Sequence, residues 1–182
     1  MGEVELKIKE VAEQFCADSP ECRMERFKLL LPTVLENYKG GIIEIGAGFG
    51  LSTEIFLQTD REVIVVDAFN DGYDYDLFAL KFKHVCRLVT LKFNSQDKGV
   101  SRLLAQYAPF AFAFVDGGQL KHEVIHDLEM MQMLGVKVIC VDDMNRETPT
   151  SQVPAAIKEF QTTSEYKLVK KRPIQEAYLI RK

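Results

Sequence analysis

The stretch GGIIEIGAGFGLST, residues 40–53, decides the fold of this chain. It starts as a short apolar strand, continues into a glycine-rich turn and ends where a helix begins. The glycines let the backbone turn tightly and approach a ligand, because no Cβ stands in the way. A second apolar strand, residues 62–67, ends in Asp67, whose carboxylate could accept two hydrogen bonds from the vicinal hydroxyls of a ribose. Together the two segments predict a pocket for a nucleoside.

The spacing of the glycines separates this turn from the usual dinucleotide motif. The chain has Gly46-x-Gly48-x-Gly50 after Glu44, whereas dinucleotide-binding turns have G-x-G-x-x-G. The turn is one residue shorter, and no basic partner for a pyrophosphate follows it. The charge of Glu44 suits a ligand that carries an ammonium or sulfonium group better than one that carries phosphates. A tight strand-to-helix turn in another kind of α/β protein is the alternative.

Composition limits the class of protein and its partners. The chain has 182 residues, of which 47% are hydrophobic and 27% charged, so we expect one folded domain over residues 1–182. The net charge of -4 argues against a nucleic-acid partner. No apolar run reaches membrane-spanning length and the first residues are not signal-like, so we expect no membrane partner. The four cysteines form no C-x-x-C pair, which favours a reduced, cytoplasmic setting.

Apolar runs and helical patterns alternate along the chain. Nearly continuous apolar runs predict buried parallel strands near residues 41–45, 62–67, 87–93, 111–116 and 136–142. Helical patterns between them lie near residues 50–59, 74–84, 98–107 and 119–134. A further helix near residues 152–163 leads to two strands, 166–171 and 177–180, which form an antiparallel hairpin. The pattern predicts an α/β fold with a doubly wound, seven-stranded sheet of five parallel strands plus this C-terminal hairpin.

Residues 1–39 read as N-terminal helices, over residues 3–17 and 20–38, ahead of a Rossmann-like core in residues 40–182. These helices could pack on the sheet, cap the site or form the contact of a homodimer.

The predicted strands end in polar or acidic residues. In open α/β sheets, ligands bind at the carboxyl ends of the strands. Five such tips follow one another along the chain, at residues 44–46, 67–69, 94–97, 116–118 and 142–145. None of them carries Lys or Arg, so we expect one acidic site along this edge of the sheet.

Several of these motifs resemble one family of enzymes. The E-x-G-x-G-x-G segment of residues 44–50 resembles the first motif of class I S-adenosylmethionine-dependent methyltransferases. Residues 89–97 are similar to the adenine-binding strand end of catechol-type O-methyltransferases, and residues 114–118, FVDGG, resemble the FVDGDHS signature of small-molecule methyltransferases. The resemblance covers about residues 40–160. It implies a Rossmann-like transferase that uses S-adenosylmethionine to methylate an oxygen of a small hydroxylated acceptor.

The resemblance also implies which residues hold the cofactor. The methionine part would be surrounded by Glu44, Gly46, Ala47, Gly48, Phe49 and Gly50. Asp67 would hold the ribose, and Asp116 would also contact the cofactor. The adenine would lie among Ala68, Phe69, Ser95 and Gln96, with Phe69 offering an apolar face for stacking.

The acids after the fourth and fifth strands could carry the chemistry. Asp116, Asp142, Asp143 and Asn145 resemble the oxygen cluster that binds a divalent cation in metal-dependent O-methyltransferases. Hard oxygen ligands suit Mg²⁺ or a related cation, which would lower the pKa of an acceptor hydroxyl. The alternative is that Asp116 contacts the cofactor or caps the next helix, while Asp142 and Asp143 are loop acids. Catalytic candidates are therefore Asp116, Asp142 and Lys121, the last as a base if its pKa falls.

The chain departs from the family pattern after Asp116. Gly118 replaces an acid of the signature, and Gln119, which cannot act as a general base, stands where relatives have histidine. Two further functions therefore stay open: a nucleoside-cofactor binding protein without turnover, and a nicotinamide-dependent oxidoreductase on the same type of sheet. The segment HEVIH, residues 122–126, matches the zinc motif H-E-x-x-H, but exposed histidines on an amphipathic helix are the simpler interpretation.

Overall fold

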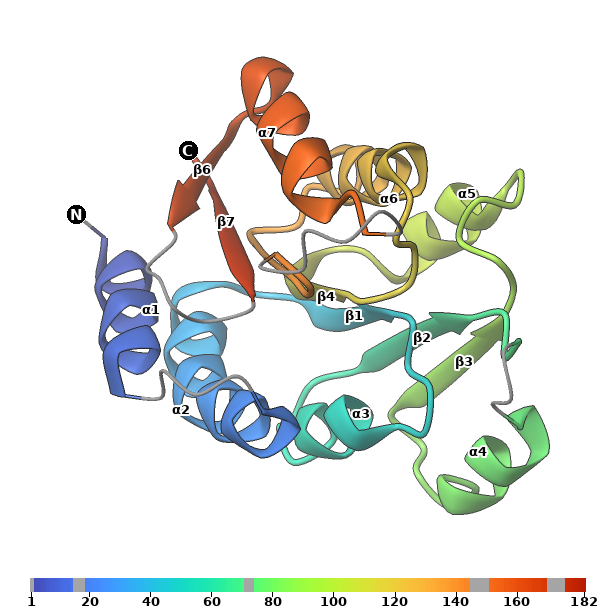
Figure 1. Cartoon of the computed structure of the whole chain (residues 1–182). Helices are drawn as coiled ribbons and strands as arrows, with labels where there is room; N and C mark the ends of the chain where they lie inside the picture. The colour runs from blue at the N-terminus through green and yellow to red at the C-terminus, as the bar shows by residue number, and fades with distance from the viewer. Residues whose placement is uncertain (1, 15–18, 71–73, 145–150, 170–175) are drawn as a thin grey trace.

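One mixed sheet of seven strands organises the described part of the chain (Figure 1). The computed structural model describes residues 2–14, 19–70, 74–144, 151–169 and 176–182. The strand order is β3-β2-β1-β4-β5-β7-β6. The strands are β1 (Gly41–Ile45), β2 (Val63–Asp67), β3 (Leu88–Lys92), β4 (Phe110–Val115), β5 (Val138–Val141), β6 (Tyr166–Val169) and β7 (Ala177–Arg181).

The pairing confirms the predicted fold class. β1 pairs in parallel with both β2 and β4, and β3 and β5 extend the parallel part on either side. β7 then pairs antiparallel with β5 and β6, which is the predicted C-terminal hairpin. The strand order reverses between β1 and β4, so the carboxyl ends of these two strands form the switch point where such sheets bind ligands.

Helices cover both faces of the sheet and bury the apolar side chains of its strands (Figure 1). One face packs against the first four helices, α1 (Glu3–Gln14), α2 (Pro20–Asn37), α3 (Leu51–Phe56) and α4 (Tyr75–Lys81). The other face packs against α5 (Val100–Leu104), the 3-10 turn η1 (Ala105–Tyr107), α6 (Lys121–Met133) and α7 (Val153–Thr163). Coverage on both faces explains why the parallel strands are almost continuously apolar.

Several element bounds differ from those predicted. The helix expected over residues 98–107 begins only at Val100, since Gly99 adopts a left-handed conformation, and its last three residues form the 3-10 turn. The first helix is described over Glu3–Gln14, and the remainder of the predicted 3–17 segment lies outside the described residues. No helix in the described parts of the chain combines the length and hydrophobicity that a membrane crossing requires.

Candidate active site

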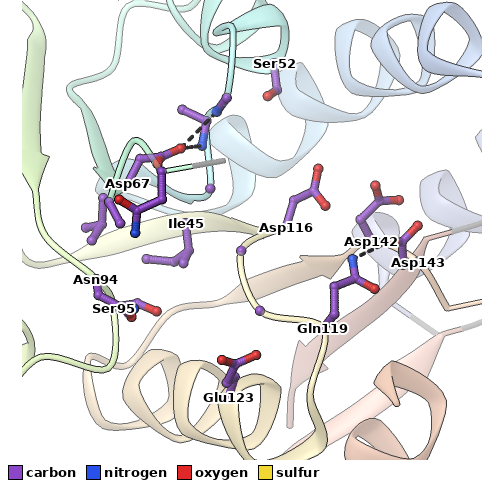
Figure 2. A pocket seen from close by; sticks show the side chains of 18 of the residues that line it. Ile45, Ser52, Asp67, Asn94, Ser95, Asp116, Gln119, Glu123, Asp142 and Asp143 are labelled. Carbon is purple, nitrogen blue, oxygen red and sulfur yellow. Dashed lines mark hydrogen bonds between the residues drawn. The ribbon is translucent and has the colours of Figure 1, made fainter. Parts of the chain in front are cut away.

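A cavity of about 690 Å³ opens at the carboxyl ends of the parallel strands (Figure 2). This volume is within the range of small-molecule sites in proteins. Eleven of the residues predicted from the sequence line it: Gly46, Ala47, Gly48, Phe49, Asp67, Ala68, Ser95, Gln96, Asp116, Asp142 and Asp143. The strand tips therefore meet in one place, as their positions in the sequence predicted.

Asp67 holds the glycine loop in this structure. Its Oδ2 accepts hydrogen bonds from the backbone N–H groups of Ala47 and Gly48, at 2.7 and 2.9 Å (Figure 2). Its Oδ1 accepts a third, from the backbone N–H of Phe69. A carboxylate has about four lone-pair sites, so ribose hydroxyls would share this group with the loop or displace one of its amides. Asp67 thus shapes the loop and borders the cavity at the same time.

Glu44 lies beneath the loop and does not line the cavity. Its side chain is fully buried and accepts hydrogen bonds from the hydroxyls of Ser52 and Thr53, at the start of α3. Burial raises the pKa of Glu44 from 4.5 to about 7, although the two hydroxyls oppose the shift. The structure therefore shows Glu44 joining the end of β1 to α3, and its direct contact with a cofactor stays a prediction.

We expect Glu44→Gln to make the stability of the protein less dependent on pH. A folded pKa above the unfolded value of 4.5 means that this group destabilises the fold increasingly as the pH rises from 4.5 to about 7. The shift corresponds to roughly 3 kcal/mol at pH 8, which the neutral amide avoids. Urea unfolding should show the variant gaining stability relative to wild type as the pH rises from 4 to 8. The exposed Glu36→Gln is the control, and an unchanged pH dependence in Glu44→Gln would contradict the assignment.

Phe69 does not present its ring to the cavity. It has a positive φ of 52° and is 8% exposed, and its ring packs against Tyr75 and Phe78 with centroids 5.2 and 5.1 Å away. The cavity wall in this region is formed instead by Ala68, Asn70 and Phe93. Phe93, just after β3, is 43% exposed, so it offers the apolar surface that the sequence had assigned to Phe69.

Ser95 and Gln96 line the same end of the cavity and are tied to α6. The side-chain amide of Gln96 donates to Asp127 Oδ1 at 3.1 Å. Asp127 is fully buried, and its burial raises its pKa from 3.8 to about 7. This contact fixes the loop after β3 against α6.

Carboxylates gather at the other end of the cavity, after β4 and β5. Asp116, Asp142 and Asp143 lie near one another there, and Asp142 and Asp143 are almost completely buried (Figure 2). Burial, reinforced by the Asp142 carboxylate, raises the pKa of Asp116 well above its ordinary value, and burial raises that of Asp142 to about 6. The guanidinium of Arg23, from the second turn of α2, opposes both shifts.

Arg23 forms ion pairs with two of these carboxylates. Its Nη1 lies 2.6 Å from Asp142 Oδ2 and 3.4 Å from Asp116 Oδ2. Its Nε lies 3.6 Å from the buried carboxylate of Glu176, which also pairs with Arg26 Nη2 at 2.6 Å. The acids therefore face a guanidinium that the N-terminal part of α2 carries into the site.

These residues do not fit a divalent cation in the arrangement that the structure shows. Nη1 of Arg23 already pairs with the two oxygens that such an ion would bridge. Asn145 lies outside the described residues, and within them no three acidic, histidine or cysteine side chains form a group suited to a metal. His122 and His126 are both exposed on α6.

Two further predicted site residues, Lys121 and Gly50, lie away from the cavity wall. Lys121 forms an ion pair with Glu159 of α7 rather than reaching the acids. Gly50, directly before α3, packs against the ring of Phe82, which follows α4. Gln119 does line the cavity, and its side-chain amide donates to Asp143 Oδ2, so it holds an acid in place (Figure 2).

Sequence reasoning allowed the N-terminal helices to cap the site but missed the residues that α2 contributes. Its first turns bring Pro20, Arg23 and Met24 to the cavity. One signal was available: Arg26 stands one helical turn before Leu30, on the face that buries Phe27, Leu30 and Leu31. A charged side chain on an apolar helix face requires a buried partner, but the partner, Glu176, is 150 residues away in the sequence.

Comparison with known proteins identifies the fold. No protein-family model and no curated protein sequence matches this chain. Among solved structures, it is similar to CalS11, a TDP-rhamnose 3'-O-methyltransferase of calicheamicin biosynthesis, with 18% identity, a TM-score of 0.68 and coverage of 98% of this chain and 93% of that one. It is also similar to TomG, an O-methyltransferase of tomaymycin synthesis from Streptomyces achromogenes in complex with SAM. The identity is 14% and the TM-score 0.67, with coverage of 100% of this chain and 91% of that one.

A third similar structure is the O-methyltransferase from Bacillus cereus in complex with SAH, at 15% identity and a TM-score of 0.63, with coverage of 100% of this chain and 92% of that one. The likeness to all three spans nearly the whole of this chain. The chain therefore has the fold of the class I S-adenosylmethionine-dependent O-methyltransferases.

Proposed function

We propose that this protein is an S-adenosylmethionine-dependent methyltransferase that acts on an oxygen of a small hydroxylated molecule. The observation that carries the proposal is the cavity at the switch point of this fold. It joins a glycine loop tied to Asp67 at one end with a group of carboxylates at the other. The loop would hold a cofactor that supplies a methyl group, and the acids line the part of the cavity left for an acceptor.

The cofactor would be held by backbone and carboxylate groups. All of the following line the cavity: Gly46, Ala47, Gly48 and Phe49 would border the methionine part of the cofactor, Asp67 its ribose, and Ala68, Ser95 and Gln96 its adenine. Glu44 and Gly50 would contribute indirectly, because Glu44 binds the hydroxyls of Ser52 and Thr53 and Gly50 packs against Phe82. This environment is acidic, which suits the positive charge of a sulfonium ion and of an amino group.

The transfer itself is an in-line displacement. When bound, S-adenosylmethionine would supply the methyl group: a lone pair of the acceptor oxygen would form the new C–O bond as the methyl–sulfur bond breaks, with the electron pair of that bond staying on sulfur. The hydroxyl proton would pass to the carboxylate of Asp116, which lines the cavity. Asp142 pairs with the guanidinium of Arg23, and Asp143 accepts a hydrogen bond from the side-chain amide of Gln119. Lys121 has no part in this scheme because its ammonium group pairs with Glu159.

We expect Phe93→Ala to weaken binding of S-adenosylhomocysteine about tenfold, because stacking on an aromatic ring contributes roughly 1–3 kcal/mol per base. Phe69→Leu should change the affinity less than about threefold, since the ring of Phe69 faces Tyr75 and Phe78. Isothermal titration calorimetry measures both. If Phe69→Leu weakened binding more than Phe93→Ala does, Phe69 would be the residue that stacks on the adenine.

The function is tested by incubating the protein with radiolabelled S-adenosylmethionine and a panel of catechols, phenols and sugar derivatives. Asp116→Asn is the matched variant, because it keeps the shape of the side chain and removes its charge. Methyl transfer that Asp116→Asn lowers strongly would support the proposal. Tight cofactor binding without transfer to any acceptor would favour a binding protein without turnover, and a preference for NAD would favour an oxidoreductase.

A further inference from the structure

Arg23 is the only cationic side chain of the described residues that both lines the cavity and pairs with its acids. Its Nη1 lies 2.6 Å from Asp142 Oδ2 and 3.4 Å from Asp116 Oδ2, so it pairs with both carboxylates. A divalent cation that joined these two carboxylates would bind the same oxygens, at about 2.0–2.6 Å. The guanidinium nitrogen and such an ion would therefore occupy the same space.

Contacts on several sides hold the guanidinium in this position. Nε faces Glu176 at 3.6 Å, and Cζ lies 5.9 Å from the centre of the Phe114 ring. Glu176 is itself fixed by Arg26, and both of these side chains are fully buried. Since α2 begins at Pro20 with Ser19 as its N-cap, the helix start fixes how far Arg23 reaches into the site.

The charges also disfavour a second cation. A guanidinium stays protonated at every pH at which proteins fold, and its planar fork suits bridging carboxylates. Binding a divalent ion beside it would place like charges in contact within a buried site. Removing the guanidinium would instead leave three acids, Asp116, Asp142 and Glu176, without this counter-charge.

We propose that the guanidinium of Arg23 takes the place of a divalent cation at the strand-end carboxylates, so that the site excludes metal ions. If the protein transfers methyl groups as proposed above, that transfer is then metal-independent, and Arg23 is a positioning residue that orders Asp116 and Asp142. The exclusion of metal ions itself does not depend on the reaction.

The proposal is tested by titrating the protein with Mn²⁺ and following free Mn²⁺ by electron paramagnetic resonance. Wild-type protein should not bind Mn²⁺ at micromolar concentrations. Arg23→Gln should bind it at least about tenfold more tightly, because juxtaposed like charges weaken binding by more than that. Adding Asp142→Asn to Arg23→Gln should abolish the gain, and the exposed Arg102→Gln should behave as wild type.

Two further measurements keep the result decisive. Arg23→Lys retains the charge and should exclude Mn²⁺ even if Arg23→Gln does not fold, which circular dichroism will show. Micromolar Mn²⁺ binding by wild type that is lost in Asp142→Asn would overturn the proposal, and so would a folded Arg23→Gln that binds no better than wild type. Binding of S-adenosylhomocysteine, measured separately, distinguishes failure of this proposal from failure of the proposed function.

Discussion

Asp67→Ala should weaken binding of S-adenosylhomocysteine about 100-fold. Two hydrogen bonds from ribose hydroxyls to a charged acceptor contribute roughly 3 kcal/mol together, and about 1.4 kcal/mol corresponds to a tenfold change in affinity. The same substitution removes the acceptor of the Ala47 and Gly48 N–H groups, so the glycine loop also loses its anchor. Calorimetric titration of the variant measures the combined effect.

Two controls separate these contributions. Asp67→Asn keeps one acceptor oxygen for the loop. Its affinity for S-adenosylhomocysteine should fall about tenfold, because a neutral amide oxygen forms weaker hydrogen bonds than a carboxylate. Asp60→Ala changes an exposed acid outside the cavity and should bind as wild type does. If folded Asp67→Ala retained the wild-type affinity, the ribose would not be held by this carboxylate.

Gly46→Ala should destabilise the protein by at least about 3 kcal/mol, the range of severe core changes. Gly46 has a φ of +82°, which L side chains rarely adopt, and a Cβ there would lie 2.4 Å from the backbone oxygen of Asp116. The contact is with backbone at the end of β4, so no side-chain rotation can relieve it. Chemical denaturation at neutral pH measures the loss.

Gly99→Ala is the matched control for this substitution. Gly99 also has a positive φ, of +99°, but a Cβ there meets nothing within 4 Å. Gly99→Ala should therefore lower the free energy of unfolding only by the conformational strain, about 1–2 kcal/mol. Equal losses in the two variants would show that the close approach of Gly46 to Asp116 is unimportant.

The sequence predicted the sheet well because its signals are local. Each parallel strand is a short apolar run, and helical patterns separate these runs. β1, β2, β4 and β5 are largely buried, whereas the edge strand β3 is partly exposed. In a parallel sheet the carboxyl ends of all strands lie at the same edge, so the chain direction alone predicts which edge carries the site. The strand ends that contain Gly46, Asp67, Asp116 and Asp142 meet there as predicted. The resemblance of the glycine loop and of the Asp116 segment to methyltransferase motifs is consistent with the observed fold.

The orientation of individual side chains could not be predicted in the same way. Phe69 and Phe93 both follow strands, and only packing against α4 decides that Phe69 turns away from the cavity. Lys121 is close to Asp116 in sequence, but Glu159 on α7 provides its partner. Glu44 is adjacent to the loop, yet its hydrogen bonds run to α3. Each outcome depends on a contact between segments that no local pattern specifies.

The role of Arg23 depends on an even longer-range contact. The residue is 93 positions from Asp116 in the sequence and enters the site only because α2 packs across the sheet. The sequence suggested that the N-terminal helices could cap the site, and the structure specifies a guanidinium as the group they supply. The prediction of a homodimer stays a prediction.

Titration of the wild-type protein with S-adenosylhomocysteine, beside NAD, tests the central claim most directly. The proposed function predicts binding of micromolar order for S-adenosylhomocysteine, none for NAD, and no dependence on added Mg²⁺. Absence of heat and of a thermal shift with S-adenosylhomocysteine, or tighter binding of NAD, would contradict the assignment of the cavity to S-adenosylmethionine.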